Sequence, residues 1–192
     1  MPFRDAFHVF PRLTSPRLVL RQLQEADAAA CYQQLTHPEV CKFYGNANSI
    51  ERRSLDSARS AILQANNHFQ RKQMIVWGIC MQGQEEAVIG RIALQDFTNQ
   101  TIAELAYWLA RPFWGQRIMS EALRRVLSFT CEELELHRIW AGTDPRNLAS
   151  CRLLERNGFV REGVLRQATY RDDGWVDTAI YSLLREEYME RP

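Results

Sequence analysis

The chain has 192 residues, of which 24 are Lys or Arg and 23 are Asp or Glu, so its formal net charge is +1, and 46% of its residues are hydrophobic. These proportions are typical of a globular protein and exclude a fibrous or wholly disordered chain. The balanced charge predicts neither a nucleic-acid partner nor an anionic membrane partner, and no apolar run approaches the ~20 residues of a membrane-spanning helix.

The first predicted elements are a strand and two helices. Leu18 to Leu20 forms a short apolar run between charged residues and predicts a strand. Asp27 to Leu35 predicts a helix, because it contains a run of alanines and its acidic residues favour a helix N-terminus. Ser49 to Phe69 predicts an amphipathic helix, because its apolar side chains recur every three or four residues.

The middle of the chain predicts an antiparallel three-strand meander. The three runs are Met74 to Met81, Ala87 to Leu94 and Ile102 to Leu109. Gln82 to Glu86, which contains a glycine, separates the first two runs and is typical of a hairpin connection. Thr98-Asn99-Gln100 predicts a second turn, between the second and third strands.

The last third of the chain predicts helices alternating with strands. A turn over Arg111 to Gln116 leads into a predicted helix over Arg117 to Glu133, and a strand over Arg138 to Thr143 follows. A short helix is then expected after Asn147 and is stopped by Asn157-Gly158. Two closing strands are expected at Phe159-Val160 and at Thr178 to Leu184. A mixed sheet with helices on both faces satisfies this order, and the helix from Arg117 reads as a parallel βαβ crossover. We therefore expect a mixed α/β fold with one domain.

Five cysteines stand at scattered positions without a CxxC pair, namely Cys31, Cys41, Cys80, Cys131 and Cys151. The four histidines are equally scattered, so no zinc-type spacing is present and we predict no metal site. We interpret the cysteines as reduced thiols, which predicts a cytoplasmic protein, and residues 1–12 lack the pattern of a secretory leader.

The turn before Arg117 is the strongest candidate for a binding site. A strand leads into a glycine-containing turn and then into a helix, whose first backbone N–H groups have no internal acceptor. Such a helix start suits an anion such as a diphosphate, although many strand-turn-helix units contain one glycine and bind nothing. A dinucleotide-binding domain is disfavoured, because no GxGxxG follows a predicted strand and because a meander precedes the crossover.

The flanking residues give this turn a family resemblance. The segment resembles the acetyl-CoA-binding region of the GNAT N-acetyltransferases, and more narrowly the RimJ/RimL type that acetylates ribosomal-protein N-termini. The residues that carry the resemblance are Tyr107-Trp108-Leu109, Trp114 to Leu123, Asn147 to Ser150, Leu153 to Phe159, Glu162-Gly163, Arg166, Asp173 to Asp177, Tyr181 and the opening Ser15 to Arg21. It runs from about Leu13 to Tyr188 in family order, and it implies a GNAT fold around a mostly antiparallel mixed sheet.

The resemblance also implies a coenzyme and a set of contacts. The expected co-substrate is acetyl-CoA, and the residues expected to contact it are Tyr107, Trp108, Leu109, Trp114, Gly115, Gln116, Arg117, Ile118, Met119, Ser120 and Asn147. One position departs from the family pattern, because Arg117 stands where the family usually has glycine. A positive φ there costs an arginine about 1 kcal/mol or more, whereas a guanidinium swung toward a phosphate forms charge-assisted hydrogen bonds. We expect coenzyme binding to be retained.

The implied reaction is direct attack by an amine in a ternary complex. Glu104, a carboxylate between apolar strand residues, is the candidate base. Such a carboxylate either faces solvent as an ordinary strand residue or lies in a cleft that raises its pKa, and only the second case suits a base. Ser150 is the candidate acid near the coenzyme sulfur, unless it is only a helix N-terminal serine that is hydrogen-bonded locally. Asn147 is expected to cap the same helix or to form a hydrogen bond with the coenzyme, and these two roles are compatible. Thr169 and Leu154 replace a glutamate and a tyrosine that many relatives carry, so neither role transfers to them.

Two functions remain open from the sequence. The first is an N-acetyltransferase whose acceptor is a protein N-terminus or a small-molecule amine. The second is a non-catalytic acyl-CoA-binding or regulatory module on the same fold, which Arg117 and Thr169 favour. In either case we expect a monomer or a homodimer.

Overall fold

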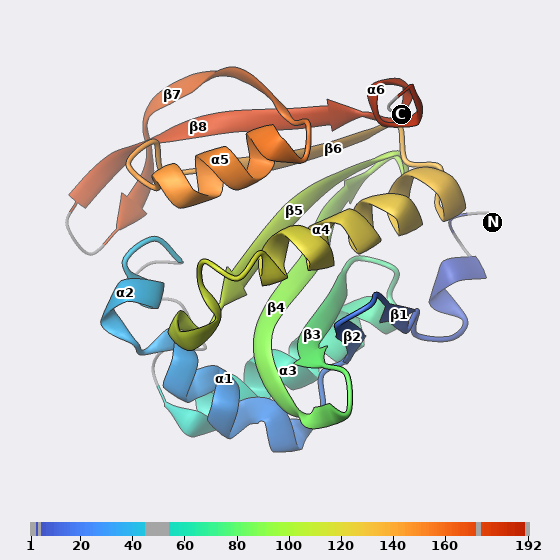
Figure 1. Ribbon diagram of the computed structural model, residues 1–192, viewed down its shortest axis with the longest axis vertical. Helices are drawn as coiled ribbons and strands as arrows, with labels where there is room; N and C mark the ends of the chain where they lie inside the picture. The colour runs from blue at the N-terminus through green and yellow to red at the C-terminus, as the bar shows by residue number, and fades with distance from the viewer. Residues whose placement is uncertain (1–2, 4, 45–53, 172–173, 191–192) are drawn as a thin grey trace.

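The computed structural model describes residues 3, 5–44, 54–171 and 174–190, and its centre is an eight-stranded sheet (Figure 1). The strands lie in the order β1-β2-β3-β4-β5-β6-β8-β7. Their bounds are Leu13–Thr14 (β1), Leu18–Gln22 (β2), Ile75–Met81 (β3), Gln84–Thr98 (β4), Ile102–Leu109 (β5), Arg138–Thr143 (β6), Val160–Arg171 (β7) and Gly174–Leu184 (β8). Of the strand pairs that the structure describes, β5 with β6 is parallel and the others are antiparallel. The predicted mixed sheet is confirmed.

Helices lie on both faces of the sheet, as the sequence predicts. Figure 1 shows α4 in front of the central strands and α3 behind them. The helices are Ala28–Leu35 (α1), Pro38–Cys41 (α2), Leu55–Gln70 (α3), Ile118–Ser128 (α4), Leu148–Arg156 (α5) and Arg185–Met189 (α6). Short turns of 3-10 helix span Asp5–Phe7, Glu25–Asp27 and Arg111–Phe113, and Phe129–Glu133 forms a π-helical turn after α4.

Two apolar cores fill the space between the sheet and these helices. Alternate residues of β3 enter the two cores, because successive side chains of a strand point to opposite faces. Trp77 packs with the α4 side chains Ile118 and Leu123 in one core. Val76 packs with residues of α1 and α3 in the other core. A strand buried on both faces reads as a continuous apolar run, which is why Met74 to Met81 predicted it well.

The predicted crossover positions the start of α4 between two strands. β5 leads through the Arg111–Phe113 turn into α4, and the chain returns along β6, parallel to β5. The helix packs its apolar stripe on the sheet, where Ala122, Leu123 and Val126 are fully buried. The first turn of α4 therefore lies beside the end of β5.

Several predicted boundaries are wrong, and the helix before β3 is tested only in part. The segment 45–53 lies outside the described residues, so only α3 from Leu55 onward bears on the helix expected over Ser49 to Phe69. The hairpin after β3 turns at residues 82–83, because Met81 already pairs with Gln84. The closing strands are also much longer than expected: β7 and β8 form one long hairpin, whose first strand is largely exposed on both faces and so carries no apolar alternation.

Candidate active site

A cleft opens where β5 and β6 separate. The parallel ladder pairs Ile102–Glu104 with Arg138–Trp140 and ends there, so the β5 edge that faces β6 has no strand partner from Leu105 to Leu109 among the described residues. Figure 1 shows the two strands diverging from this paired end. The resulting cleft has a volume of about 1120 Å³ and runs between the start of α4 and α5. That volume slightly exceeds the ~300–1,000 Å³ typical of small-molecule sites.

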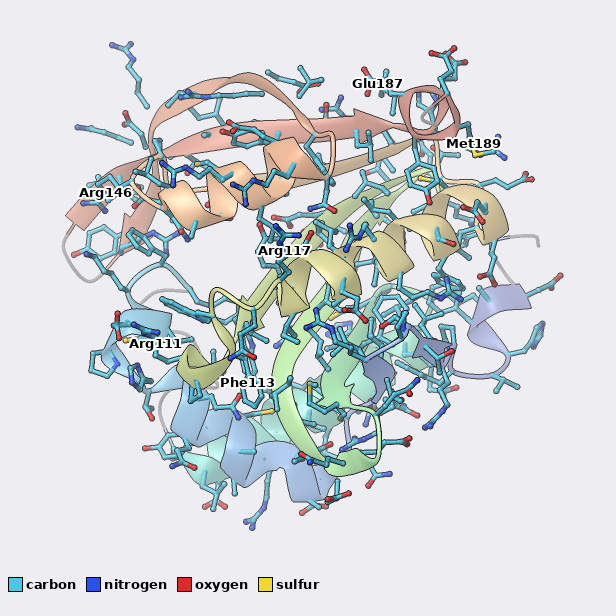
Figure 2. The ribbon with its side chains drawn as sticks, in the orientation of Figure 1. Arg111, Phe113, Arg117, Arg146, Glu187 and Met189 are labelled. Carbon is cyan, nitrogen blue, oxygen red and sulfur yellow. The ribbon has the colours of Figure 1, made fainter. Side chains whose placement is uncertain are left out.

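The loop before α4 presents backbone donors to this cleft. Gly115 has a φ of 74° and Arg117 a φ of 60°, so the chain turns sharply into the helix. The first hydrogen bond of α4 is donated by the Glu121 N–H to the Arg117 carbonyl, at 3.1 Å. The N–H groups of residues 118–120 therefore have no acceptor within the helix, and they carry the positive end of its dipole. Figure 2 shows Arg117 between this helix start and α5.

The structure brings nearly all the predicted site residues to this one cleft. Those that line it are Glu104, Tyr107, Trp108, Leu109, Trp114, Gly115, Arg117, Ile118, Met119, Ser120, Asn147 and Ser150. Gln116 is the exception: its side chain donates to the Pro112 carbonyl at 2.8 Å and lies outside the cleft lining. Its amide therefore holds the turn together from the outside.

Trp114 is held by its own loop. Its Nε1 donates to the Leu109 carbonyl at 2.7 Å, and the Arg111 guanidinium lies 5.1 Å from the centre of its ring. Arg111 in turn donates from Nε to the Glu39 carboxylate of α2 at 2.6 Å. These contacts connect α2 to the loop that precedes α4.

Glu104 is the last residue of β5 that pairs with β6, and it lies where the two strands begin to separate. Its side chain is half-buried, and its Oε2 accepts from Gln95 Nε2 at 2.9 Å. Burial raises the pKa of Glu104, and Asp96 adds to this, while the Gln95 hydrogen bond only partly opposes it. A carboxylate with a raised pKa is a stronger proton acceptor than an ordinary glutamate.

Ser150 and Tyr107 form a hydroxyl pair across the cleft. Their oxygens lie 2.7 Å apart, and the Ser150 N–H donates to Asn147 Oδ1 at 3.2 Å, so Asn147 caps α5 as predicted. Burial raises the pKa of Tyr107, so its hydroxyl keeps its proton. The sequence did not predict this contact between the two side chains.

Besides Arg117, two further positions differ from many relatives, and both have structural roles. Leu154 is fully buried in the core under α5. The Thr169 hydroxyl lies 2.7 Å from the Thr178 hydroxyl, across the β7–β8 hairpin. Six basic residues of the cleft were not predicted as site residues, namely Lys42, Arg124, Arg146, Arg152, Arg156 and Arg171. The spacing of the three on helices, Arg124, Arg152 and Arg156, gave only a weak signal.

Comparison with known proteins agrees with this geometry. The sequence model described as the acetyltransferase (GNAT) domain matches residues 17–160, which cover β2 to the first residue of β7. The chain belongs to the GNAT acetyltransferase family. It is therefore an acetyltransferase, and the fold expected from the resemblance is confirmed.

The relatives of this GNAT chain include ribosomal-protein acetyltransferases. The uncharacterized N-acetyltransferase YoaA of Bacillus subtilis is 35% identical over 92% of this chain and 98% of its own length. The ribosomal-protein-serine acetyltransferase of Escherichia coli is 34% identical over 51% of this chain and 55% of its own length. The solved structure of RimL, a ribosomal L7/L12 alpha-N-protein acetyltransferase in complex with coenzyme A, has a TM-score of 0.82 at 22% identity, covering 92% of this chain and 99% of that one. The RimJ/RimL-type resemblance is confirmed.

The described part of the chain contains neither a membrane-spanning helix nor a cluster of metal-ligating side chains. None of the helices in the described ranges is long and apolar enough to cross a membrane. Within the same part of the chain, no group of three or more His, Cys, Asp or Glu side chains is arranged to hold a metal ion.

Proposed function

We propose that this acetyltransferase transfers an acetyl group from acetyl-CoA to a primary amine, by direct attack in a ternary complex. The observation that carries the proposal is the fork of β5 and β6, with Glu104 at its base and the Tyr107–Ser150 hydroxyl pair along its wall. One candidate proton acceptor and one candidate proton donor thus line a single cleft of sufficient volume.

The donor groups of the cleft fit coenzyme A. The N–H groups of residues 118–120 and the Arg117 guanidinium suit the diphosphate. The unpaired edge of β5 from Leu105 to Leu109 suits the amide groups of the pantetheine arm, which extended backbone binds as it would another strand. The coenzyme, when bound, supplies the acetyl group as a thioester.

Glu104 is proposed to remove the proton from the acceptor amine. An amine is mostly protonated at neutral pH, and only its neutral form attacks a thioester. The raised pKa of Glu104 makes its carboxylate a better acceptor for that proton, either directly or through one water. Gln95 fixes the carboxylate orientation through its 2.9 Å hydrogen bond.

Ser150 is proposed to donate a proton to the departing thiolate. The raised pKa of Tyr107 keeps its phenol protonated, so the phenol can donate a hydrogen bond to the Ser150 oxygen while the serine proton moves to sulfur, and a proton from solvent then restores the serine hydroxyl. A thiolate with a reference pKa of about 8.5 is already a fair leaving group, so this contribution is modest. Backbone N–H groups of the β5 edge are proposed to stabilise the negative charge that develops on the thioester oxygen.

The proposed acceptor is the N-terminal amine of a protein. Support comes from the relatives, which are named for acetylating ribosomal proteins. The part of the cleft beside α2 is lined by Phe43, Tyr44 and Glu39. The Glu39 carboxylate is paired with Arg111 at 2.6 Å, so this part offers mainly aromatic surface to an acceptor. A small-molecule amine is the alternative acceptor.

A thiol-release assay tests this proposal. The acceptors are peptides beginning with Ala or Ser, polyamines and amino sugars, each offered with acetyl-CoA. We expect turnover with at least one peptide, and loss of turnover but not of acetyl-CoA binding in Glu104→Ala. Coenzyme binding without turnover for any acceptor would instead favour a non-catalytic acyl-CoA-binding module.

A further inference from the structure

The cleft is far more basic than the chain as a whole. Seven basic side chains and two acidic ones line it, whereas the whole sequence carries a net charge of only +1: Lys42, Arg117, Arg124, Arg146, Arg152, Arg156 and Arg171, with Glu39 and Glu104. A cleft lined by one sign of charge attracts ligands of the opposite sign. The lining therefore favours a polyanionic ligand.

The six arginines among these residues fall into two classes. Arg146 and Arg171 have a carboxylate nearby, since their guanidinium nitrogens lie 2.7 and 3.8 Å from Asp144 Oδ2. Four arginines form no ion pair with the described residues, although their side chains are exposed: Arg117, Arg124, Arg152 and Arg156. Their charge remains available to a ligand.

Contacts between α4 and α5 bring two of these arginines to the same part of the cleft. Asn157, which follows α5, donates from Nδ2 to Ser120 Oγ in the first turn of α4, at 3.4 Å. Arg156 directly precedes Asn157, and Arg124 follows Ser120 by about one helical turn. Arg156 and Arg124 therefore lie on the two sides of one helix–helix contact. By comparison, the neighbouring Arg125 is paired with Glu133 at 3.3 Å.

Arg117 stands about two turns before Arg124 along the same helix, a separation of about 10 Å. If Arg117 and the α4 amides hold the diphosphate, the next anionic group of the coenzyme is the phosphate on the 3′-oxygen of its ribose. A phosphate monoester carries up to two charges and suits the planar guanidinium fork of arginine. The acceptor end of the cleft, at Phe43 and Tyr44, lies against α2 and not at the α4–α5 contact.

We infer that Arg124 and Arg156 bind the 3′-phosphate of coenzyme A, so that this protein selects coenzyme A over 3′-dephospho-coenzyme A. The inference rests on the proposed function, because it presupposes that the diphosphate binds at the start of α4. It adds a recognition site formed by two helices, separate from the loop before α4.

Isothermal titration of the purified protein with coenzyme A and with 3′-dephospho-coenzyme A tests the inference without relying on turnover. We expect wild-type protein to bind coenzyme A about tenfold more tightly, as is typical of exposed charge-assisted hydrogen bonds. In Arg124→Gln/Arg156→Gln this ratio should fall to about one, through weaker binding of coenzyme A alone. The ratio in wild type should also shrink as salt is raised.

Arg71→Gln serves as the matched control, because Arg71 is exposed at the end of α3 and lies outside the cleft lining. It should keep the wild-type ratio, and circular dichroism melts should confirm that both variants fold. Equal binding of the two ligands by wild type, or an unchanged ratio in the double variant, would overturn the inference and leave the proposed function standing. If neither ligand binds wild type, the proposed function fails and the inference fails with it.

Discussion

Arg117 offers the sharpest test of how this chain binds its coenzyme, because its backbone and its side chain have opposite effects. Its φ of 60° and ψ of 15° place it in the left-handed region, at the residue that precedes α4. That conformation costs a residue with a Cβ about 1–2 kcal/mol, whereas glycine adopts it freely. The guanidinium, however, lines the cleft and forms no ion pair with the described residues.

Arg117→Gly should therefore stabilise the free protein slightly and weaken coenzyme binding. Relief of about 1–2 kcal/mol in the folded state is partly offset by about 0.4–1 kcal/mol from the greater entropy of glycine in the unfolded chain. The net gain is about 0–1.6 kcal/mol, and at this chain length each kcal/mol raises Tm by about 2–4 °C. Loss of one exposed charge-assisted contact should raise the Kd for coenzyme A about tenfold.

Calorimetry of the free protein and titration with coenzyme A measure the two effects separately. Arg117→Asn is the control, since asparagine tolerates the left-handed region but carries no charge. It should weaken binding as much as glycine does, with a smaller change in Tm. Tighter binding by Arg117→Gly would show that the arginine obstructs the phosphates, and an unchanged Kd would refute both accounts of this residue.

Three further predictions concern the reaction and the support of α4. Glu104→Gln should lower kcat by about 10²–10⁴-fold and leave the Kd of coenzyme A unchanged. In the wild type, kcat/KM should fall as pH drops through the raised pKa of Glu104, which lies above the ordinary ~4.3. A fall in kcat/KM only at or below pH ~4.3 would argue against Glu104 as the base. Ser150→Ala and Tyr107→Phe should each lower kcat about tenfold, and the double variant should lose less than the product because the two hydroxyls share one hydrogen bond. Multiplicative losses in steady-state assays would separate their roles. The Glu121 carboxylate accepts hydrogen bonds from Ser15 and Arg17. Burial raises the pKa of Glu121, but these hydrogen bonds outweigh burial, so its net pKa is lowered. The ionised carboxylate therefore stabilises the fold at neutral pH, and this contribution is lost as pH falls below about 4.3. Glu121→Gln should lower Tm by about 3 °C at pH 7, and the difference from wild type should shrink in acid; a constant difference would contradict the linkage.

The fold was predictable wherever one physical signal dominated. The bounds of β5 match the expected Ile102 to Leu109, because a buried strand between two turns leaves a distinct apolar run. The helix from Arg117 was expected to reach Glu133, but α4 ends at Ser128 and a π-helical turn follows. There the backbone changes geometry while the apolar periodicity continues, and periodicity alone cannot detect that change.

The site was predictable where it depends on neighbouring residues in the sequence, and not where it depends on how separate helices and strands pack against one another. The start of α4 and the cap at Asn147 are local features, and both formed as expected. The pairing of Tyr107 with Ser150 joins β5 to α5, and no spacing within the sequence encodes that distance. For the same reason the sequence did not predict that Arg156 lies near α4, which follows from the Asn157–Ser120 contact.

The two ends of the cleft differ in how their sequences encode them, and this explains why coenzyme and acceptor are not equally predictable. The α4 end is made by a helix start, whose unpaired N–H groups bind phosphate whatever the neighbouring side chains are. The proposed acceptor end is formed by the four-residue α2 and by Phe43 and Tyr44, and α2 is held to the Trp114 loop through the 2.6 Å pair of Glu39 with Arg111. A substitution of Glu39 would remove this link, whereas a substitution of Phe43 or Tyr44 would change the proposed acceptor surface and leave the link in place. We therefore expect the fold to constrain the acceptor less than the coenzyme.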